Sequence, residues 1–378
     1  MSAVAAGLVA TSLARISARR WGTRVVDQIP TLSLNRAPRD DAAKERGLLP
    51  HISVIIPTFN RAAILVDTLN ALLRQDYPAE RLEIIIVDNS SSDNTEEVVR
   101  EAHRGSRCPL FYHRKENRGP AASRNYGIAR ARGEIVAFTD SDCRPCPGWL
   151  RAGVSAFGPG IGLVSGPIRP VFHPNRPVGH FYHQIDEVTA ENPLYPSANV
   201  FFSKAVLQEM GGFDERFGVR FWGSLLGGED TDLAWRAKRA GHLSAFAPAA
   251  RVDHEATRVS IGRWLVEPFR SEVLPILVAQ FPELREKLLW RRYFVYHFTL
   301  AFYFAVAGVL LGLTTKFMPA FAALLPLLYL MRGLGWQDIN NPRRWWRILA
   351  RYALHLYRLT VTIAGLWYGS IRARTLVI

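Results

Sequence analysis

Between residues 52 and 142 the chain alternates short apolar runs with amphipathic segments, and no other pattern in it limits the fold as strongly. A nearly continuous apolar run such as Ile52–Pro57 is typical of a strand covered on both faces. Strands that alternate with helices require right-handed crossovers and build a parallel sheet, so we predict an α/β fold. The predicted strands are Ile52–Pro57, Leu82–Asp88, Leu110–His113, Gly133–Asp142, Gly162–Ser165 and, last, Leu243–Phe246. The predicted helices are Arg61–Gln75, Asp93–His103 (capped by Ser92 or Asp93), Pro120–Ala131, Gly148–Phe157 and Glu229–Ala240.

Polar and acidic residues stand where these strands end. Ligands of such sheets bind beyond the carboxyl ends of the strands, which places Thr58–Arg61, Asp88–Ser91 and Asp140–Asp142 on one rim. The last segment offers two carboxylates to a hard cation such as Mg²⁺ or Mn²⁺, ions that commonly share their ligand shell with phosphate oxygens. An isolated Asp-x-Asp is usually a solvated turn. The prediction of a cation site therefore depends on the place of Asp140–Asp142 at a strand end. Asp88 could bond a ribose or base, or cap the turn Asn89–Ser92.

Two further segments carry residues suited to a nucleotide or a sugar. Arg124, in "ENRGPAASRNYG", could form a two-pronged hydrogen bond with a phosphate or bond a base carbonyl. Glu229 and Asp230 open a predicted helix after two glycines. We expect the helix start to lower the pKa of a carboxylate there, which would keep a general base ionised. Ordinary compensation of the helix dipole is the alternative explanation.

The chain has 378 residues and a net charge of +14, and the excess is confined to its flanks. Residues 1–48 carry eight Lys and Arg against four acids, residues 286–378 carry twelve against two, and the centre is neutral. Basic flanks beside apolar runs favour an anionic membrane surface over nucleic acid as a partner. The three cysteines, Cys108, Cys143 and Cys146, are too few for a disulfide framework and favour a reduced, cytosol-facing catalytic region.

We predict three regions: a basic leader and linker over 1–50, a catalytic domain over 51–285 and membrane-associated helices over 286–378. The leader lacks the charged start of a signal peptide. Its residues around Arg15–Trp21 suit either a short amphipathic surface helix or a disordered segment.

The C-terminal region contains two uncharged runs and a basic segment. Tyr293–Thr315 is long enough to cross a bilayer, Phe317–Met331 is shorter, and together they predict a membrane hairpin. A pair of buried core helices is the alternative. Arginines at the outer ends place both ends, with the catalytic domain, in the cytoplasm. The basic residues Arg347, Arg351, His355 and Arg358 predict an interfacial helix that binds lipid phosphates, or a third spanning helix.

The motifs follow one another in an order that resembles glycosyltransferase family 2, which comprises inverting enzymes of GT-A fold. The matching segments are "SVIIPTFNR", "IIIVDNSSSDNT", "NRGPAASRNYGI", "GEIVAFTDSD", "GGFDERF" and "GEDTDLAWRAKRAG", and they span Ile52 to Glu255. The resemblance implies a Rossmann-like, mostly parallel sheet. It also implies transfer of a hexose from a nucleotide sugar, with UDP as the commonest nucleotide.

The resemblance assigns roles to the matching residues. Asp230 would be the general base, with Glu229 beside it contacting the acceptor or donor sugar. Asp142 would bind Mg²⁺ or Mn²⁺, and Asp140 would contact the ribose or diphosphate and share the metal site. His254 stands where some relatives place a metal ligand, although a core or surface histidine is the simpler explanation. The nucleotide would be held by Pro57, Thr58, Asn60, Arg61, Asp88, Arg124 and Asp140.

One departure from the family narrows the expected activity. Processive members carry Gln-x-x-Arg-Trp after the Glu-Asp pair, whereas "SIGRW" here has Ser260 in place of the glutamine. The apolar segments are also too few for a polymer channel. We therefore expect a non-processive enzyme that adds one sugar to a lipid-linked or glycan acceptor at the cytoplasmic membrane face, in polysaccharide or glycolipid synthesis. The alternatives are a catalytically silent, sugar-nucleotide-binding assembly subunit and a nucleotidyltransferase on a related sheet.

Overall fold

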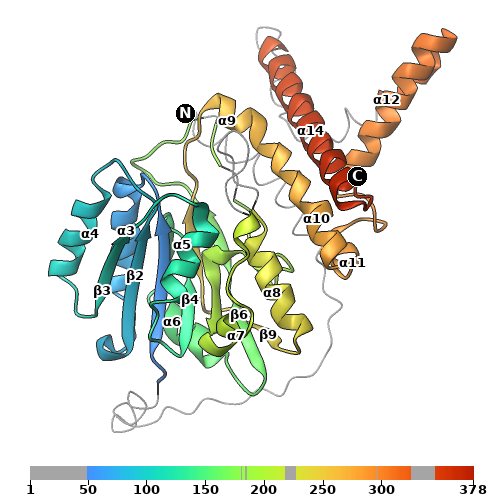
Figure 1. The fold of residues 1–378 in the computed structure, drawn as a ribbon. Coiled ribbons are helices and arrows are strands. Elements are labelled where there is room, and N and C mark those ends of the chain that lie inside the picture. Colours follow the sequence, from blue (N-terminus) through green and yellow to red (C-terminus); the bar gives the residue numbers. More distant parts are fainter. Residues whose placement is uncertain (1–48, 180, 184, 218–226, 296, 325–344) are drawn as a thin grey trace, which may run out of the picture. The chain divides into compact units, whose positions relative to one another are not determined.

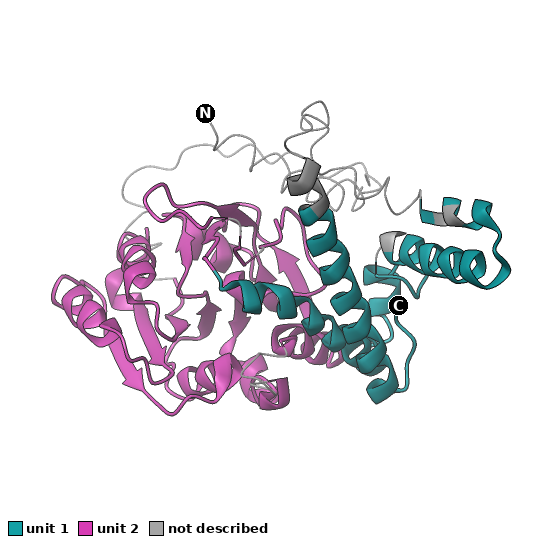
Figure 2. Ribbon diagram, turned by 90° about the horizontal axis from the view of Figure 1, so that it is seen from above, with its two compact units in different colours: residues 1–22, 259–378 teal, residues 23–258 magenta. Residues whose placement is uncertain are grey.

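The computed structural model describes residues 49–179, 181–183, 185–217, 227–295, 297–324 and 345–378. They fall into two compact units, which meet in the sequence between Arg258 and Val259. The unit that ends at Arg258 (magenta in Figure 2) comes first in the described sequence and is called the first unit, and the one that begins at Val259 (teal) is called the second unit. The predicted leader lies outside the described residues except for its last two positions. Residues 325–331 of the second uncharged run also lie outside them.

The first unit is built on a seven-stranded sheet with the strand order β3-β2-β1-β4-β8-β6-β9 (Figure 1). The strands are β1 (Ile52–Thr58), β2 (Leu82–Asp88), β3 (Leu110–Arg114), β4 (Ile135–Phe138), β6 (Ile161–Ser165), β8 (Val200–Ser203) and β9 (Leu243–Phe246). β1 pairs in parallel with β2 and β4, whereas β8 runs antiparallel between β4 and β6. The mostly parallel sheet predicted from the sequence is confirmed, and β8 is a strand that the pattern missed.

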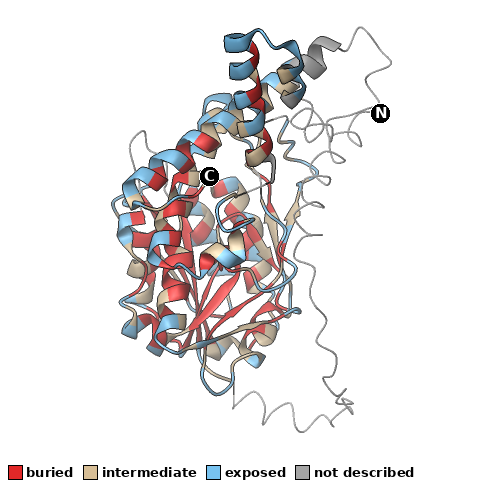
Figure 3. Cartoon of the chain, turned by 90° about the vertical axis from the view of Figure 1, so that its right-hand side faces the viewer, coloured by how far each residue is buried: buried red, intermediate tan, exposed pale blue. Residues whose placement is uncertain are grey.

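The strands of this sheet are largely buried (Figure 3). Both faces of the sheet are covered, because successive residues along a strand enter different cores. Val54 and Ile56 of β1 belong to the core under α3, α4 and α6, while Ile55 belongs to the core under α5, α7 and α8. Burial on both sides explains why the strands are apolar at nearly every position. The helices are α3 (Ala62–Leu73), α4 (Thr95–Arg104), α5 (Gly119–Ile128), α6 (Trp149–Ser155), α7 (Lys204–Glu209) and α8 (Glu229–Arg239).

The start of α4 differs from the prediction. The residue before the helix is Asn94 rather than Ser92 or Asp93, and it makes no side-chain capping bond. Asp93 instead accepts the N–H groups of Thr95 (3.2 Å) and Ala62 (2.9 Å). Its carboxylate therefore ties the starts of α3 and α4 together.

The sequence pattern does not predict the second sheet of this unit. Its strands β5 (Cys143–Pro145), β10 (Val252–Glu255) and β7 (Ile168–Val171) pair in the order β5-β10-β7, so β9 is not the last strand. They are three or four residues long and mix charged with apolar side chains, so neither length nor alternation marks them. The register pairs His254 with Cys143, which brings the end of the domain next to Asp142.

The second unit is helical. Its elements are α9 (Ile261–Val266), η5 (Glu267–Glu272), α10 (Val273–Gln280), α11 (Leu284–Leu288), α12 (His297–Thr315), η6 (Met318–Ala323) and α14 (Trp345–Ala373). α14 lies directly against η5. The two are so close at Gly369 that a Cβ there would be 2.2 Å from the carbonyl oxygen of Glu272. None of the helices in the described ranges combines the length and apolar character that crossing a membrane requires. The predicted spanning helix over Tyr293–Thr315 is therefore not supported.

The predicted basic stripe of the last helix is wrong for Arg358. Its guanidinium donates a hydrogen bond to the carbonyl oxygen of Trp264 and lies 4.0 Å from the centre of that indole ring. Arg358 thus holds α14 against α9 within the unit, instead of standing free for lipid. The side chains of Arg347 and Arg351 lie outside the described part of the chain.

Candidate active site

The ends of β1 and β2 bring two predicted segments together. Thr58 ends β1 opposite Asp88, which ends β2. Beyond them, Oδ1 of Asn60 accepts the N–H of Ser92 (2.7 Å), and the N–H of Asn60 donates to Ser91 Oγ (2.8 Å). Asn60 has a φ of 51°, a left-handed conformation that asparagine tolerates better than most residues. The first two loops of the rim are thus joined directly, as the strand-end rule predicted.

Asp88 is buried, and both of its carboxylate oxygens already accept protein donors. One accepts the N–H (2.9 Å) and hydroxyl (2.6 Å) of Ser91, and the other accepts the hydroxyl of Tyr112 (2.6 Å). The turn-capping role that the sequence left open for Asp88 is therefore present. Beside it, Pro57 and Thr58 complete β1. The hydroxyl of Thr58 is buried without a hydrogen-bond partner in the described part of the chain, so a ligand could satisfy it.

Arg124 links the two acidic pairs of the sequence. Its Nη2 donates to Oδ1 of Asp140 and its Nη1 to Oε1 of Glu229, both at 2.9 Å. The side chain is 5% exposed, and its guanidinium lies 5.5 Å from the centre of the Phe213 ring. A planar guanidinium between two carboxylates has a fixed geometry. Arg124 therefore fixes the loop after β4 relative to the start of α8. Both of its terminal nitrogens bond carboxylates, whereas the sequence had suggested a phosphate or a base as their partner.

The neighbours of Arg124 explain its position. α5 lies so close to β1 that a Cβ on Gly127 would be 2.6 Å from Cγ2 of Ile55. The amide of Asn125 accepts the N–H of Phe213 and donates to its carbonyl oxygen, both at 2.8 Å. The glycine and asparagine of the "RNYG" motif thus serve packing, and they hold the arginine between the acids.

Asp142 lies in a group of potential metal ligands. β4 ends at Phe138, so Asp142 stands in the turn beyond the strand and not in it. Its Oδ2 accepts a hydrogen bond from Arg61, and its Oδ1 lies 3.1 Å from Nε2 of His254 without hydrogen-bond alignment. With the Cys143 thiol, the ligand atoms of these three residues lie within 4.8 Å of one another.

This donor set fits a divalent cation. The carboxylate, with one buried oxygen left without a hydrogen bond, suits Mn²⁺ or Mg²⁺, and the imidazole adds a nitrogen ligand of the kind that transition metals accept. His254, for which the sequence left two explanations open, is thus brought to the candidate cation site. Asp140 was also expected to share the metal site. Among the described residues it does not belong to the group of Asp142, Cys143 and His254, and its carboxylate pairs with Arg124 instead.

Burial and charge set the protonation states around Asp142. Burial alone would raise the pKa of Asp142, but Arg61 and His254 hold it well below its usual value. Burial likewise opposes the charged form of His254, but the adjacent Asp142 carboxylate raises its pKa well above 6.5. Burial raises the pKa of the Cys143 thiol. Asp142 is therefore ionised, and Cys143 is a neutral thiol near neutral pH.

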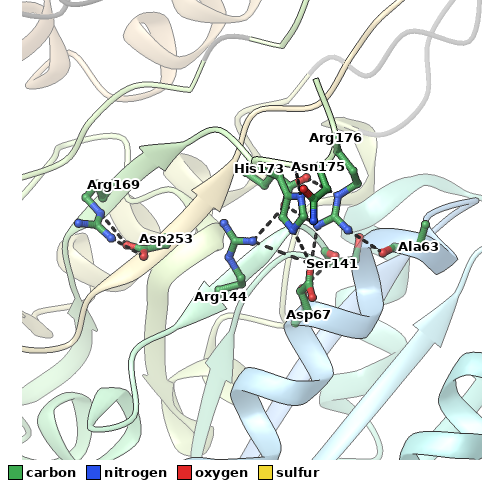
Figure 4. A network of polar contacts seen from close by, with 11 residues as sticks. Ala63, Asp67, Ser141, Arg144, Arg169, His173, Asn175, Arg176 and Asp253 are labelled. Carbon is green, nitrogen blue, oxygen red and sulfur yellow. Dashed lines mark hydrogen bonds and ion pairs between the residues drawn. The ribbon is translucent and has the colours of Figure 1, made fainter. Parts of the chain in front are cut away.

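A polar network adjoins this group (Figure 4). Glu255 of β10 donates its N–H to the carbonyl oxygen of Asp142 (2.8 Å). The buried carboxylate of Glu255 accepts two hydrogen bonds of 2.8 Å from Arg176. Arg176 also bonds the carbonyl of Ala63 (3.2 Å) and the carboxylate of Asp67 on α3. The network ties β10 to α3, and no local sequence pattern predicts it because its partners are 79 to 113 residues apart.

Asp230 and Glu229 begin α8. Oδ2 of Asp230 accepts the N–H of Ser197 (3.1 Å), and Oδ1 accepts the N–H of Thr231 (2.8 Å). Ser197 was not predicted, since a backbone donor leaves no side-chain signal. Burial, together with the neighbouring Glu229, raises the pKa of Asp230 to about 7. The expectation of a lowered pKa is wrong, because burial and like-charge repulsion outweigh the helix dipole.

The fold and the placement of the two acidic pairs match a known arrangement. A mostly parallel sheet, with one acidic pair after its fourth strand and another at the start of a later helix, is the GT-A arrangement. The mannosyltransferase PcManGT from Pyrobaculum calidifontis, solved in complex with GDP-Man and Mn²⁺, shares the fold with a TM-score of 0.59. The match covers 96% of both chains at 22% identity. The described fold therefore resembles that of a glycosyltransferase of known structure.

Sequence comparison finds similar proteins for the first unit. Residues 53–212 match the family model Glycosyl transferase family 2. Glycosyltransferase AglE of Haloferax volcanii is 32% identical over 205 residues, which are 53% of this chain and 65% of that protein. GalNAc(5)-diNAcBac-PP-undecaprenol beta-1,3-glucosyltransferase of Campylobacter jejuni is 38% identical over 95 residues, 25% of this chain and 30% of that protein. The chain thus spans less than two thirds of these curated relatives.

Proposed function

We propose that this chain is a metal-dependent, inverting glycosyltransferase that moves one sugar from a nucleotide-sugar donor to an acceptor hydroxyl. The observation that carries the proposal is the Arg124 bridge. It joins the loop of Asp140 and Asp142 to the helix that begins with Glu229 and Asp230. A candidate cation site and a candidate base are thereby held in one place, as a transfer between a diphosphate donor and a hydroxyl acceptor requires.

The donor would bind at the rim formed by β1, β2 and β4. Asp142 and His254 would hold the cation, which when bound offsets the negative charge that develops on the departing diphosphate. The unpartnered hydroxyl of Thr58 lies at the same edge and offers a hydrogen bond to the nucleotide. The GDP-Man bound by PcManGT makes GDP sugars candidates beside the UDP sugars expected from the sequence.

Asp230 would act on the acceptor. Its carboxylate takes the proton of the acceptor hydroxyl while the hydroxyl oxygen attacks the anomeric carbon. The new C–O bond forms on the face opposite the leaving nucleoside diphosphate, so a single displacement inverts the configuration. The N–H of Ser197 holds one carboxylate oxygen in place during the transfer. A pKa near neutrality makes this carboxylate a stronger base than an exposed aspartate.

The pH dependence of the reaction follows from that pKa. A general base must be deprotonated, and the pKa of Asp230 is raised to about 7. We expect the logarithm of kcat/KM to rise by about one per pH unit below neutrality and to level off above it. Initial rates measured at constant ionic strength on both sides of neutrality test this. A profile that is flat from pH 5 to 8 contradicts a raised pKa for the base.

We propose a lipid-linked or glycan acceptor and one transfer per encounter. The Campylobacter relative, whose name gives an undecaprenyl-linked substrate, supports the lipid-linked class. Ser260, which stands in place of the glutamine of the processive motif, is the N-cap residue of α9. Its Oγ accepts the N–H of Arg263 (3.2 Å) and caps α9.

The function is tested with the purified full-length protein, Mn²⁺, lipid extracts and a panel of UDP and GDP sugars. Mass spectrometry should find a product heavier by one sugar for one donor. NMR coupling constants should show that its anomeric configuration is opposite to that of the donor. A ladder of products contradicts single transfer, and retained configuration contradicts the role of Asp230.

We further propose that the second unit binds the cytoplasmic face of the membrane. Several large apolar side chains of α12 and the turn after it are exposed: Phe304, Leu310, Leu311, Leu313, Phe317 and Met318. Residues 286–378 also carry most of the excess positive charge. Apolar side chains beside basic residues bind the interface of anionic bilayers. The free cysteines support a reducing, cytoplasmic setting.

Vesicle flotation tests the membrane proposal. The full-length protein should float with phosphatidylglycerol vesicles and much less with phosphatidylcholine vesicles, since anionic lipid attracts the basic flank. The double variant Leu310→Gln, Leu313→Gln should lose most of this binding. Leu243→Gln, which changes a leucine of the first unit that is 58% exposed, is the matched control and should float like the parent. Equal flotation of parent and double variant overturns the proposal.

A further inference from the structure

The carboxylate of Asp142 is buried beside two basic side chains, Arg61 and His254. The Asp142 side chain is only 4% exposed, and Oδ2 accepts a hydrogen bond from Arg61. A buried carboxylate without a counter-charge is strongly unfavourable, so the protein must supply positive charge of its own when no metal is bound. The structure supplies it through Arg61 on Oδ2 and His254 beside Oδ1.

Arg61 and a divalent cation compete for the same carboxylate. A cation held by Asp142 needs a carboxylate oxygen as ligand, and Arg61 donates its hydrogen bond to one of the two oxygens. A guanidinium in contact with that carboxylate also repels a doubly charged ion bound there. Even a cation bound through the free Oδ1 would be repelled by Arg61 on Oδ2, so cation binding weakens the Arg61 contact.

Arg61 is able to leave, in contrast to the other arginine of the site. Its side chain is 35% exposed, and Asp142 is its one side-chain hydrogen-bond partner among the residues that the structure describes. Arg124 is 5% exposed and is held by two carboxylates. Arg124 is thus fixed in the site, whereas Arg61 precedes α3 at the rim and bonds a single carboxylate.

We propose that Arg61 is an internal counterion of Asp142, which the divalent cation displaces and which then binds the diphosphate of the donor. This rests on the proposed function, because it needs a cation at Asp142 and a diphosphate donor. Arg61 lowers the affinity for the cation alone and raises it when the nucleotide is present. The cation and the donor consequently bind with positive coupling, and metal-free Asp142 is never left without a counter-charge.

Electron paramagnetic resonance titration of Mn²⁺ in the absence of nucleotide tests the competition. Arg61→Gln should bind Mn²⁺ alone about tenfold or more tightly than the parent, because the ion no longer has to break a charge-assisted hydrogen bond. Arg118→Gln removes the same charge from a side chain that is 68% exposed and should leave the affinity within about twofold. Arg61→Lys keeps the charge without the fork and should lie between the parent and Arg61→Gln.

The same titrations with UDP or GDP present test the coupling. Either the active nucleotide tightens Mn²⁺ binding more in the parent than in Arg61→Gln, or the coupling is overturned. Equal or weaker binding of Mn²⁺ alone to Arg61→Gln overturns the competition, while Mn²⁺ binding by the parent still supports the proposed function. A parent that binds no Mn²⁺ with or without nucleotide overturns both. Thermal unfolding gives an independent check, since Mn²⁺ should raise the melting temperature of Arg61→Gln more than that of the parent.

Discussion

Replacement of Asp230 by asparagine is expected to lower the rate of sugar transfer by about 10²–10⁴-fold, the usual contribution of a general base. The amide can still accept the N–H of Ser197, so the fold around α8 should survive, but it cannot take a proton. Donor binding should change little, because Asp230 has no part in the cation site. Initial rates by mass spectrometry and nucleotide binding by calorimetry measure the two effects separately.

A control variant is available on the preceding helix. Glu209→Gln neutralises a carboxylate that is 52% exposed and pairs with His242, so it should keep the parent rate. The residual rate of Asp230→Asn should also lose its rise with pH through neutrality. An Asp230→Asn enzyme with the parent rate would falsify the assignment of the base.

Replacement of Asp142 by asparagine is expected to lower the rate by at least about 10²–10³-fold, since electrostatic stabilisation of the leaving group is lost. Unlike Asp230→Asn, which should spare donor binding, Asp142→Asn should impair donor binding as well as catalysis. Metal-dependent nucleotide binding should fail as well, and the remaining activity should no longer respond to added Mn²⁺. Rates and calorimetry over a series of Mn²⁺ concentrations distinguish the two variants.

Asp142→Asn also removes the partner of Arg61 and His254, so its stability must be checked. Circular dichroism and thermal unfolding show whether a loss of activity reflects the site or the fold. His254→Gln provides a second measurement, because it removes one candidate ligand and leaves Asp142 paired with Arg61. It should weaken Mn²⁺ binding without abolishing nucleotide binding at high Mn²⁺ concentration.

Much of the fold follows from local sequence. The apolar runs of β1 and β2 predict their strands to within a residue, because strands buried on both faces must be apolar throughout. The rule that ligands bind at strand ends then brings Thr58–Arg61 and Asp140–Asp142 to one edge without any structure. The helices α3, α4, α5, α6 and α8 are found for the same reason, since each must present an apolar stripe to the sheet. The short helix α7 was not predicted.

The decisive contacts of the site could not be predicted in this way. Arg124 and Glu229 are 105 residues apart, and β10 brings His254 to Asp142 through a strand too short to show a pattern. The sign of the pKa shift of Asp230 depends on burial and on Glu229, which sequence spacing does not reveal. In the tail, the spacing of Arg358 predicted a lipid-facing residue, whereas tertiary packing pairs it with Trp264.

The central claim is that Asp142 holds a divalent ion which meets the diphosphate of the donor. Calorimetric titration of the metal-free protein with UDP and GDP, with and without Mn²⁺, tests it most directly. We predict that one nucleotide binds measurably only when Mn²⁺ is present, and that Asp142→Asn abolishes this dependence together with the binding. Equal nucleotide affinity with and without Mn²⁺, or Mn²⁺-dependent binding that persists in Asp142→Asn, contradicts the claim.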